Sequence, residues 1–404
     1  MTRFAVVSNL YPPHAYGGYE LLCADTVRRW RAAGHDIAVI TSTHVRPDVG
    51  SDSAERVSDV ARVLPLSSVF VPPPAKARRL LVERTAHARL HAELERADPD
   101  VISVWNWAGL PGSLLEGIAG FGRPVVFVMG DAWLPRVRIN DPWLAAWQRA
   151  PSTVRNIASR VTGVPTSLRP LGPVGRWSFA SDALRTSMLD ADTRDGPFRD
   201  THVCHFGIDA HDFPSSPRPS RPWEWRLLYV GRLDPSKGVD TLLEALTRLP
   251  DRARLDVVGP PEVAHLDRLH ALAARLGLAD RVTFDAVPRS DLAARYRAAD
   301  ACVFPSEWDE PFGLVPLEAM ACNTPVIATG TGGSAEYLVD EANCLLFPPG
   351  DPQALAAALT RLADDRALRD RMVSAGLVTA NEFTADRFAA QLGELHLGHS
   401  KRNR

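Results

Sequence analysis

The chain has 404 residues, too many for one compact core, and its 45% apolar content is enough to fill two. A net charge of −2 excludes the strong basic excess of a dedicated nucleic-acid binder, and no apolar run approaches the roughly 20 residues of a membrane span. Five scattered cysteines predict buried thiols in a reducing compartment, and the first apolar run begins too early for a signal peptide. We therefore expect a soluble, cytoplasmic protein of two domains.

Short apolar runs alternate with helical patterns along the first half of the chain. Unbroken apolar runs are typical of strands buried on both faces, and they predict strands at 3–8, 36–42, 101–105 and 124–129. Helical periodicity falls between them, at 17–34, 76–97 and 110–120. The alternation predicts a doubly wound, Rossmann-like α/β domain over residues 1–213.

The second half repeats the scheme. Its predicted strands are 226–231, 254–259, 281–287, 301–305, 325–329 and 344–347. A Pro- and Ser-rich linker at 214–223 is expected to join the first domain to a second Rossmann-like domain at 224–383. Residues 384–404 predict a C-terminal helix and tail that cross back to the first domain. Two doubly wound domains facing each other predict a central ligand cleft.

A glycine pair opens the first predicted helix, in YPPHAYGGYE. Gly17 and Gly18 would let the backbone approach a ligand, and helix N-termini attract anions. The segment lacks the GxGxxG fingerprint of a dinucleotide site. A tight strand-to-helix turn explains the glycines equally well.

Two cations follow a predicted strand in YVGRLDPSKG. Arg232 and Lys237 suit a diphosphate, because arginine grips oxygens bidentately and lysine acts as a compact charge. Lys237 is one of only three lysines among 46 basic residues, which hints at a position where arginine does not serve. Two solvated cations beside a helix start are the alternative.

Two acids stand eight residues apart in EPFGLVPLEAMAC. The apolar spacing predicts a helix near Val315, so Gly313, Leu314 and Val315 would offer free N–H groups at its N-terminus. Glu310 stands in the preceding loop and Glu318 lies on the helix. Taken singly, each acid is explained by a capping carboxylate or an exposed helix acid.

Together these segments resemble the retaining GT-B glycosyltransferases of family 4. The resemblance rests on GGYE, on GRLDPSKG and above all on SEWDEPFGLVPLEAMACNTPVIATGTGGSAE, and it covers nearly the whole chain. By this resemblance Glu310 would bind hydroxyls of the donor sugar, and Glu318 would hydrogen-bond the nucleotide ribose. The backbone of Phe312, Gly313 and Leu314 would hold sugar and phosphate.

The resemblance also implies how the leaving group and the base are held. Arg232 and Lys237 would neutralise the departing diphosphate without a metal ion, and the base would be read near Val287. The donor would be a nucleoside-diphosphate sugar, with UDP favoured and GDP, ADP or TDP as alternatives, and no further cofactor is expected. The acceptor would be a small molecule or a glycan.

The first domain departs from the family pattern after the strand at 124–129. Many relatives carry a histidine there, whereas this chain reads Met129, Gly130, Asp131. Asp131 and Trp133 could take over part of the acceptor-binding task, although a helix cap and a packing indole explain them as well. His14, in the first loop, is another candidate for the cleft or an ordinary solvated side chain.

Other functions of the same fold stay open. A sugar-nucleotide epimerase would need additional acids and a histidine in the cleft. A phosphorylase would need a second anion site or a lysine that binds pyridoxal phosphate, for which Lys237 and Lys76 are the candidates. A non-catalytic nucleotide-sugar binding protein would not need both acids and both cations to be intact. An NAD-dependent dehydrogenase is disfavoured by the missing fingerprint. The basic pattern at 76–97 suits peripheral contact with anionic lipid, and an ordinary solvated helix is the alternative.

Overall fold

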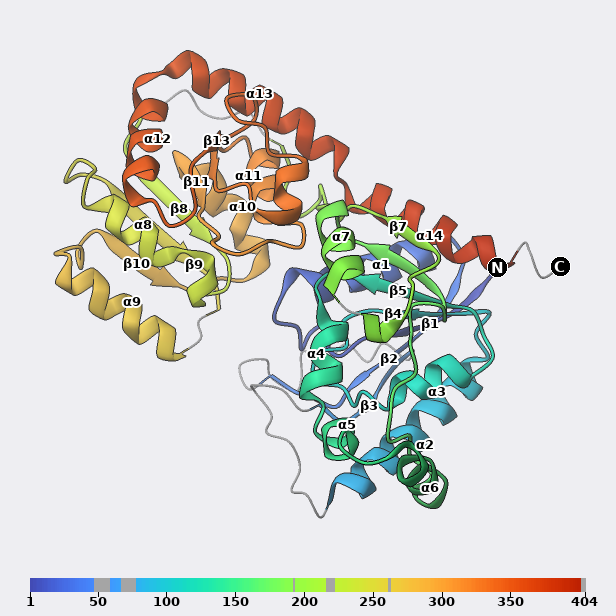
Figure 1. Ribbon diagram of the computed structural model, residues 1–404. Helices are drawn as coiled ribbons and strands as arrows, with labels where there is room; N and C mark the ends of the chain where they lie inside the picture. The colour runs from blue at the N-terminus through green and yellow to red at the C-terminus, as the bar shows by residue number, and fades with distance from the viewer. Residues whose placement is uncertain (47–58, 67–77, 192, 216–221, 261–262, 401–404) are drawn as a thin grey trace. The chain divides into compact units, whose positions relative to one another are not determined.

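The computed structural model divides the chain into two α/β units (Figure 1). It describes all residues except 47–58, 67–77, 192, 216–221, 261–262 and 401–404. The first unit comprises Met1–Cys204 and Phe388–Arg404, and the second comprises His205–Arg387.

The described residues of the first unit form a seven-stranded sheet in the order β3-β2-β1-β4-β5-β6-β7, with every adjacent pair parallel. The strands are β1 (Arg3–Val7), β2 (Asp36–Ser42), β3 (Val60–Leu64), β4 (Val101–Val104), β5 (Val125–Met129), β6 (Arg176–Phe179) and β7 (Thr201–Val203). The helices are α1 (Gly18–Ala32), α2 (Arg79–Ala97), α3 (Leu114–Gly120), α4 (Trp133–Asn140), α5 (Pro142–Trp147), α6 (Ser152–Thr162) and α7 (Asp182–Ala191), and a 3-10 turn, η3, covers Thr193–Asp195. Strand order reverses beside the central strand β1, which is where doubly wound sheets bind ligands.

The second unit carries a six-stranded parallel sheet in its described residues, in the order β10-β9-β8-β11-β12-β13. The strands are β8 (Arg226–Val230), β9 (Arg254–Val258), β10 (Val282–Asp285), β11 (Ala301–Phe304), β12 (Val326–Ala328) and β13 (Leu345–Leu346). The helices are α8 (Val239–Leu246), α9 (Val263–Arg275), α10 (Arg289–Ala298), α11 (Val315–Ala321), α12 (Pro352–Asp364) and α13 (Arg366–Glu382), and the 3-10 turns are η4 (Pro235–Lys237) and η5 (Gly332–Glu336). The last helix, α14 (Ala385–Ser400), begins in the second unit and belongs to the first unit from Phe388 onward. The predicted fold class, two Rossmann-like parallel-sheet domains, is confirmed.

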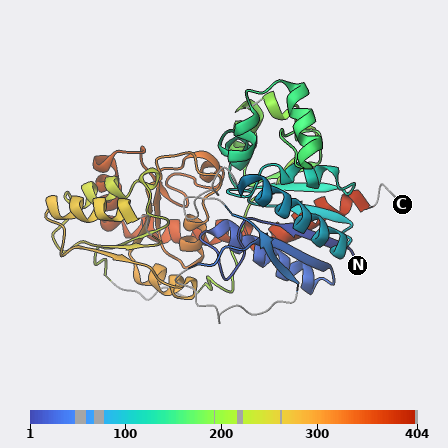
Figure 2. The same ribbon diagram turned by 90° about the horizontal axis from the view of Figure 1, so that it is seen from below.

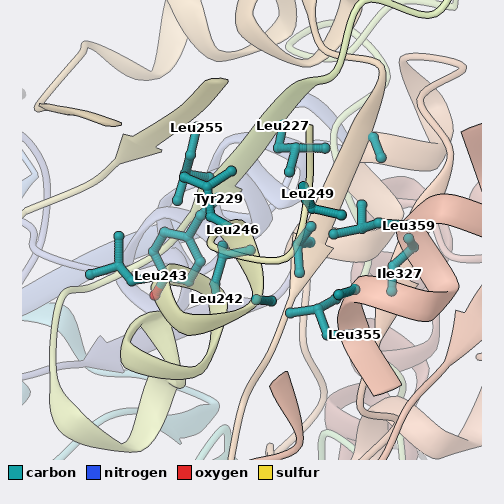
Figure 3. Packing of buried hydrophobic residues seen from close by; sticks show 14 of the residues in the cluster. Leu227, Tyr229, Leu242, Leu243, Leu246, Leu249, Leu255, Ile327, Leu355 and Leu359 are labelled. Atoms are coloured by element: carbon teal, nitrogen blue, oxygen red, sulfur yellow. The ribbon is translucent and has the colours of Figure 1, made fainter. Parts of the chain in front are cut away.

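Leucines from the sheet and from two helices interlock in the core of the second unit (Figure 3). Leu242 and Leu246 recur at helical spacing on α8, and both are fully buried against Leu227 and Leu255 of the sheet. Burying a leucine side chain stabilises a fold by about 1.5–3 kcal/mol, so this face of α8 fixes the helix on the sheet. The loop between β8 and α8 carries Lys237 and is therefore held at both ends.

The C-terminal helix crosses back to the first unit, as expected. The indole Nε1 of Trp30, on α1, donates to the Ala389 carbonyl at 2.9 Å. The buried ring of His396 hydrogen-bonds through Nε2 to Ser103 Oγ, on β4, at 2.9 Å. Contacts from α1 and from the sheet thus hold α14 near its start and near its end.

The chain changes unit between Cys204 and His205, before the linker expected at 214–223. Three contacts tie the intervening residues to the second unit: Phe206 packs near Phe312, Ile208 bridges to Thr384, and Phe213 lies against Tyr296. Most of the expected linker lies outside the described residues, as does Lys76.

The strands β3, β6 and β7 were not expected from the sequence. Arg62 interrupts β3, Arg176 begins β6, and β7 is a three-residue edge strand, so none of them shows an unbroken apolar run. All five cysteines are buried and free, as expected. In the described part of the chain, no helix has the length and apolar content needed to span a membrane.

Candidate functional site

The loop after β8 is pressed against the loop after the neighbouring strand β11. Asp234 caps the turn η4 by accepting from the Ser236 N–H at 3.1 Å. Gly238, the next residue after η4, has φ 69°, and a Cβ there would collide with the Pro305 carbonyl oxygen. Only glycine combines this conformation with so close an approach. The glycine of GRLDPSKG therefore brings Lys237 up to the segment that contains Glu310.

Lys237 and Glu310 form an ion pair at this point. The Nζ–Oε1 distance is 2.7 Å, and the two side chains are 13% and 7% exposed. Ser306 Oγ donates to the same carboxylate oxygen at 2.7 Å, and Lys237 Nζ also lies 4.9 Å from the centre of the Trp308 ring. One carboxylate oxygen thus accepts from both the ammonium and the hydroxyl. Two residues that the sequence assigned to different parts of the ligand are thus in direct contact.

The glycines that follow β12 hold the backbone of Glu310. The Gly333 N–H donates to the Glu310 carbonyl at 2.6 Å. Gly332 has φ 56°, and a Cβ on it would lie 2.5 Å from the same carbonyl oxygen. The glycine cluster downstream of the two acids is therefore needed to seat the Glu310 loop.

Phe312 contributes packing rather than an exposed ring. Its side chain is 1% exposed and lies among His205, Tyr337 and Phe383. The Tyr337 hydroxyl donates to the carbonyl of Gly313, which fixes the backbone just before α11.

Three backbone N–H groups open α11, as predicted from the sequence. Within the described residues, no protein acceptor receives the N–H groups of Gly313, Leu314 and Val315. These donors follow β11, whose neighbour β8 leads to Lys237. The arrangement is suited to an anion, because helix N-terminal N–H groups carry partial positive charge.

Glu318 is buried and bound to two donors. Tyr296 donates its hydroxyl to Oε2 at 2.8 Å, and Arg289 Nη1 lies 3.3 Å from Oε1. Arg289 also donates to Asp212 at 2.8 Å. The half-buried Val287 stands two residues before Arg289, so the predicted base-reading turn and the predicted ribose acid belong to one local cluster. A ribose hydroxyl would have to use the remaining lone pairs of Glu318 or displace Arg289.

Arg232 does not join this cluster through its side chain. The guanidinium is 59% exposed and lies 3.6 Å from Asp234. Its backbone is fixed, because the buried Tyr229 hydroxyl donates to the Arg232 carbonyl at 2.7 Å. Arg232 is thus an exposed cation on a hydrogen-bonded backbone, whereas Lys237 is largely buried.

The N-terminus of α1, in the first unit, is occupied by one of its own side chains. The Gly17 N–H donates to Glu20 Oε2 at 2.9 Å, and Gly18 begins the helix. Asn106 donates to the other oxygen of Glu20, and burial raises the pKa of this carboxyl. The glycine pair therefore serves a helix cap here. His14 is 4% exposed rather than solvated, and burial lowers its pKa.

A pocket of about 220 Å³ lies in the first unit, beside the loops that follow β4 and β5. Trp133, fully buried, lines it, and so does Arg136, which forms an ion pair with Asp131 at 2.5 Å. The structure thus places Trp133 at a cavity and Asp131 one contact away. The full lining is Pro65, Arg79, Val82, Glu83, Ala108, Gly109, Leu110, Pro111, Trp133, Arg136, Val137, Asn140, Asp141, Pro142 and Trp143.

A buried polar chain reaches the wall of this pocket. Ser113 Oγ lies 2.5 Å from Glu83 Oε2 and 2.8 Å from His87 Nε2. Burial, with a smaller effect of the Asp141 charge, raises the pKa of Glu83 to about 7, and burial lowers the pKa of His87 to about 4. The imidazole is therefore neutral near pH 7, while the carboxyl gives up its proton much less readily than an exposed glutamate.

Several of these residues gave no sequence signal. Glu83 and His87 lie in the basic helical pattern at 76–97, which predicted lipid contact or a solvated face and no polar pair, and Tyr296 and Arg289 lie in an arginine-rich helix with no motif. Ser306 and Trp308 lie within the SEWDEPFG segment, so their nearness in sequence to Glu310 was an available hint.

Two family comparisons cover most of both units. Residues 216–378 match the family described as glycosyl transferases group 1, and residues 16–165 match glycosyltransferase family 4. The chain therefore belongs to the group 1 glycosyltransferases.

Curated relatives share part of the sequence. A D-inositol 3-phosphate glycosyltransferase from Streptomyces bingchenggensis is 41% identical over 158 residues, which are 36% of this chain and 34% of that protein. A protein of the same name from Frankia alni is 42% identical over 42% of this chain and 46% of its own length. The chain thus matches less than half the length of each of these relatives.

Solved structures share the fold along the whole chain. A sucrose-phosphate synthase from Thermosynechococcus elongatus superposes with a TM-score of 0.73 at 23% identity, covering 98% of both chains. The Anabaena protein HepE, in complex with UDP and glucose, superposes with a TM-score of 0.70 at 21% identity, covering 98% of this chain and 99% of its own. The chain has the GT-B fold.

Proposed function

We propose that the chain transfers a sugar from a nucleoside-diphosphate sugar to an acceptor hydroxyl, with retention at the anomeric carbon and without a metal ion. The observation that carries this proposal is the Lys237–Glu310 pair in the loops after β8 and β11, next to the free N–H groups that open α11. A sugar ring and a diphosphate need opposite recognition, an acceptor for hydroxyls and donors for phosphate oxygens. These loops supply both kinds of group.

Each group has a task in the proposed reaction. Glu310 accepts hydrogen bonds from donor-sugar hydroxyls, while Lys237, Arg232 and the α11 N–H groups offset the charge that builds on the leaving diphosphate. No side chain is assigned as a covalent nucleophile. The acceptor hydroxyl attacks from the face that the diphosphate leaves, and the leaving phosphate oxygen takes its proton. Positioning and preorganised charge provide most of the rate enhancement.

We propose a UDP-sugar as the donor, supported by the UDP and glucose of the similar HepE structure. A thermal-shift panel with UDP, GDP, ADP and TDP tests the base, and release of nucleoside diphosphate from the matching sugars tests the activity. Glu310→Gln serves as the inactive variant, and Glu341→Gln, an exposed acid of the same unit, is its matched control. Failure of all four nucleotides to raise the melting temperature would refute the proposal.

Metal independence has its own test. Lys237 and Arg232 supply the charge that a divalent cation supplies in metal-dependent enzymes. Transfer should therefore persist in excess EDTA. Loss of activity that Mg²⁺ or Mn²⁺ restores would contradict this part of the proposal.

The pocket in the first unit is proposed to bind the acceptor. Glu83 is one of its lining residues, and among the described residues only Oε2 of this carboxyl has a hydrogen-bond partner, Ser113. Of the two arginines that line the pocket, Arg136 pairs with Asp131, and Arg79 donates to the Pro142 carbonyl at 3.0 Å. Two acids and apolar walls make the pocket a poor phosphate site. We therefore favour a neutral, partly apolar alcohol over the inositol phosphate in the names of the curated relatives.

Substitutions of Glu83 test the acceptor class. Glu83→Leu should raise the acceptor KM about tenfold, since one charged or polar hydrogen bond is lost, while Glu83→Gln should retain most of the affinity. Donor hydrolysis without an acceptor should be unchanged in both variants. Efficient transfer to a cyclitol phosphate and none to a neutral alcohol would refute the assignment.

A further inference from the structure

Helix α6 turns its apolar face away from the protein. Val154, Ile157 and Val161 recur at the spacing of one helix face and are 46%, 61% and 81% exposed. None of the eleven residues of α6 is buried. A surface helix normally directs such residues toward the core, whereas α6 directs them toward solvent.

The opposite, polar face of α6 attaches it to its own unit. Thr166 donates its hydroxyl to the Arg155 carbonyl at 2.9 Å, and its N–H donates to Ser159 Oγ at 3.0 Å. The preceding helix α5 packs Trp143 and Leu144 on Val164, just after α6, in a small separate core. Figure 2 shows the green helices of this region standing away from the strands of the same unit. The outward orientation of the valines and the isoleucine is thus built into the fold.

The charge around α6 has one sign. The 40 residues from Pro142 to Ser181 contain five arginines and no aspartate or glutamate, in a chain whose net charge is −2. Arg169 and Arg176 pair with acids outside this stretch. Within the described residues, Arg149, Arg155 and Arg160 form no ion pair. Exposed apolar side chains therefore lie between uncompensated cations.

We infer that α6 binds the surface of an anionic lipid membrane, with Val154, Ile157 and Val161 in the interface and the neighbouring arginines on lipid phosphates. Amphipathic helices with a basic polar face bind membranes in this way, reversibly and more tightly when the lipids are anionic. The sequence pointed instead to α2, but that helix carries Glu93 and Glu95 and buries Ala86, Leu90 and Leu94 within its own unit. This inference does not depend on the proposed sugar transfer.

Co-sedimentation of the full chain with vesicles tests the inference. One set contains phosphatidylcholine alone and the other also contains phosphatidylglycerol. The chain should bind the anionic vesicles, and less so as salt is added. A triple variant, V154S with I157S and V161S, should bind at least tenfold more weakly, because the apolar contact is removed.

Further variants separate charge from apolar contact. Arg155→Gln with Arg160→Gln should weaken binding to anionic vesicles by about fivefold per arginine and leave residual binding to neutral vesicles unchanged. The matched control is Val339→Ser with Val378→Ser, which removes valines of 56% and 61% exposure from the second unit and should bind as the wild type does. Melting temperatures should agree among all variants, because none of the substituted side chains is buried.

Three results would overturn the inference. The first is a wild type that ignores anionic vesicles at low salt, and the second is a triple variant that binds as well as the wild type. The third is self-association in ultracentrifugation that the triple variant abolishes, with no vesicle binding, because α6 would then meet a second copy of this chain.

Discussion

Lys237 Nζ lies 2.7 Å from Glu310 Oε1, across 73 residues of sequence. The cation expected at the leaving diphosphate and the acid expected at the donor sugar therefore neutralise each other. A bound nucleotide sugar would compete with this ion pair in two ways. Its phosphate would compete with Glu310 for Lys237, and its hydroxyls would compete with Lys237 for Glu310. Each half of the donor thus prepares the site for the other.

The two acids should respond differently to substitution. Glu310→Gln should reduce turnover by at least 100-fold, the scale of one preorganised group, while binding of the bare nucleoside diphosphate is unchanged or tighter, because Lys237 is released for phosphate. Glu318→Ala should weaken nucleotide binding by roughly 1.5–3 kcal/mol, the value of a hydrogen bond to a charged group. Calorimetric titration with nucleotide alone separates the two, and equal losses in both variants would contradict the assignment.

Lys237 should affect both rate and stability. Lys237→Ala should lower kcat by about 10²–10³ and destabilise the fold by about 3 kcal/mol, because Glu310 is left without its cation. Lys237→Arg should restore part of the rate, since a planar fork replaces a point charge imperfectly. The double variant of Lys237→Met with Glu310→Gln should regain the melting temperature but not the activity. An alanine variant with wild-type kcat would remove Lys237 from the site.

Gly332→Ala should displace the Glu310 loop. Its Cβ would lie 2.5 Å from the Glu310 carbonyl oxygen and 2.7 Å from the Asp309 carbonyl carbon, at a φ of 56°. Gly350→Ala is the matched control, because its φ of 70° is similar and no atom lies within 4 Å of the added carbon. The control should lose roughly 1–2 kcal/mol of stability and keep its activity, whereas Gly332→Ala should lose both. Similar kcat values in the two variants would show that the contact does not position Glu310.

Glu83 and His87 should have opposing effects on stability as pH changes. The folded pKa of Glu83, about 7, exceeds the unfolded value of 4.5, so the folded state holds the extra proton and stability falls as pH rises through this range. The folded pKa of His87, about 4, lies below the unfolded value of 6.5, so stability rises with pH between those values. The two slopes largely cancel between pH 4.5 and 6.5.

Single substitutions should expose each slope. In Glu83→Gln the free energy of unfolding should rise with pH between about 4 and 6.5, and in His87→Gln it should fall between about 4.5 and 7. Urea unfolding at several pH values measures both. If the free energy of unfolding depends on pH in the same way in the wild type and in both variants, the opposing pKa shifts of Glu83 and His87 are contradicted.

Sequence patterns predicted the elements that have one strong signal. Unbroken apolar runs located the central strands of both sheets, and the segment around Glu310 and Glu318 indicated the family. The edge strand β7 and the strand β3, which contains an arginine, were not predicted, because half-exposed strands mix polar and apolar residues.

Side-chain partners were harder to predict, because they come from distant elements. Nothing in GRLDPSKG shows that Lys237 reaches Glu310, since that contact depends on β8 and β11 being neighbours and on Gly238 fitting against Pro305. Tyr296 and Arg289 on Glu318 are likewise a product of packing α10 beside α11. The sequence was sufficient to identify the candidate site residues, whereas their side-chain partners could be identified only from the fold.

The return of α14 to the first unit sets an order of assembly during synthesis. The second unit is one continuous stretch, so it can fold as soon as its last helix has emerged from the ribosome. The first unit is begun earlier but must wait for Phe388 and the residues after it, which cover Trp30 and bind Ser103. A nascent chain that stalls after α13 (Arg366–Glu382) would present an unfinished first unit with exposed apolar surface. The unit that is translated first is thus completed last. Its folding can finish only after the second unit and α14 have been synthesised.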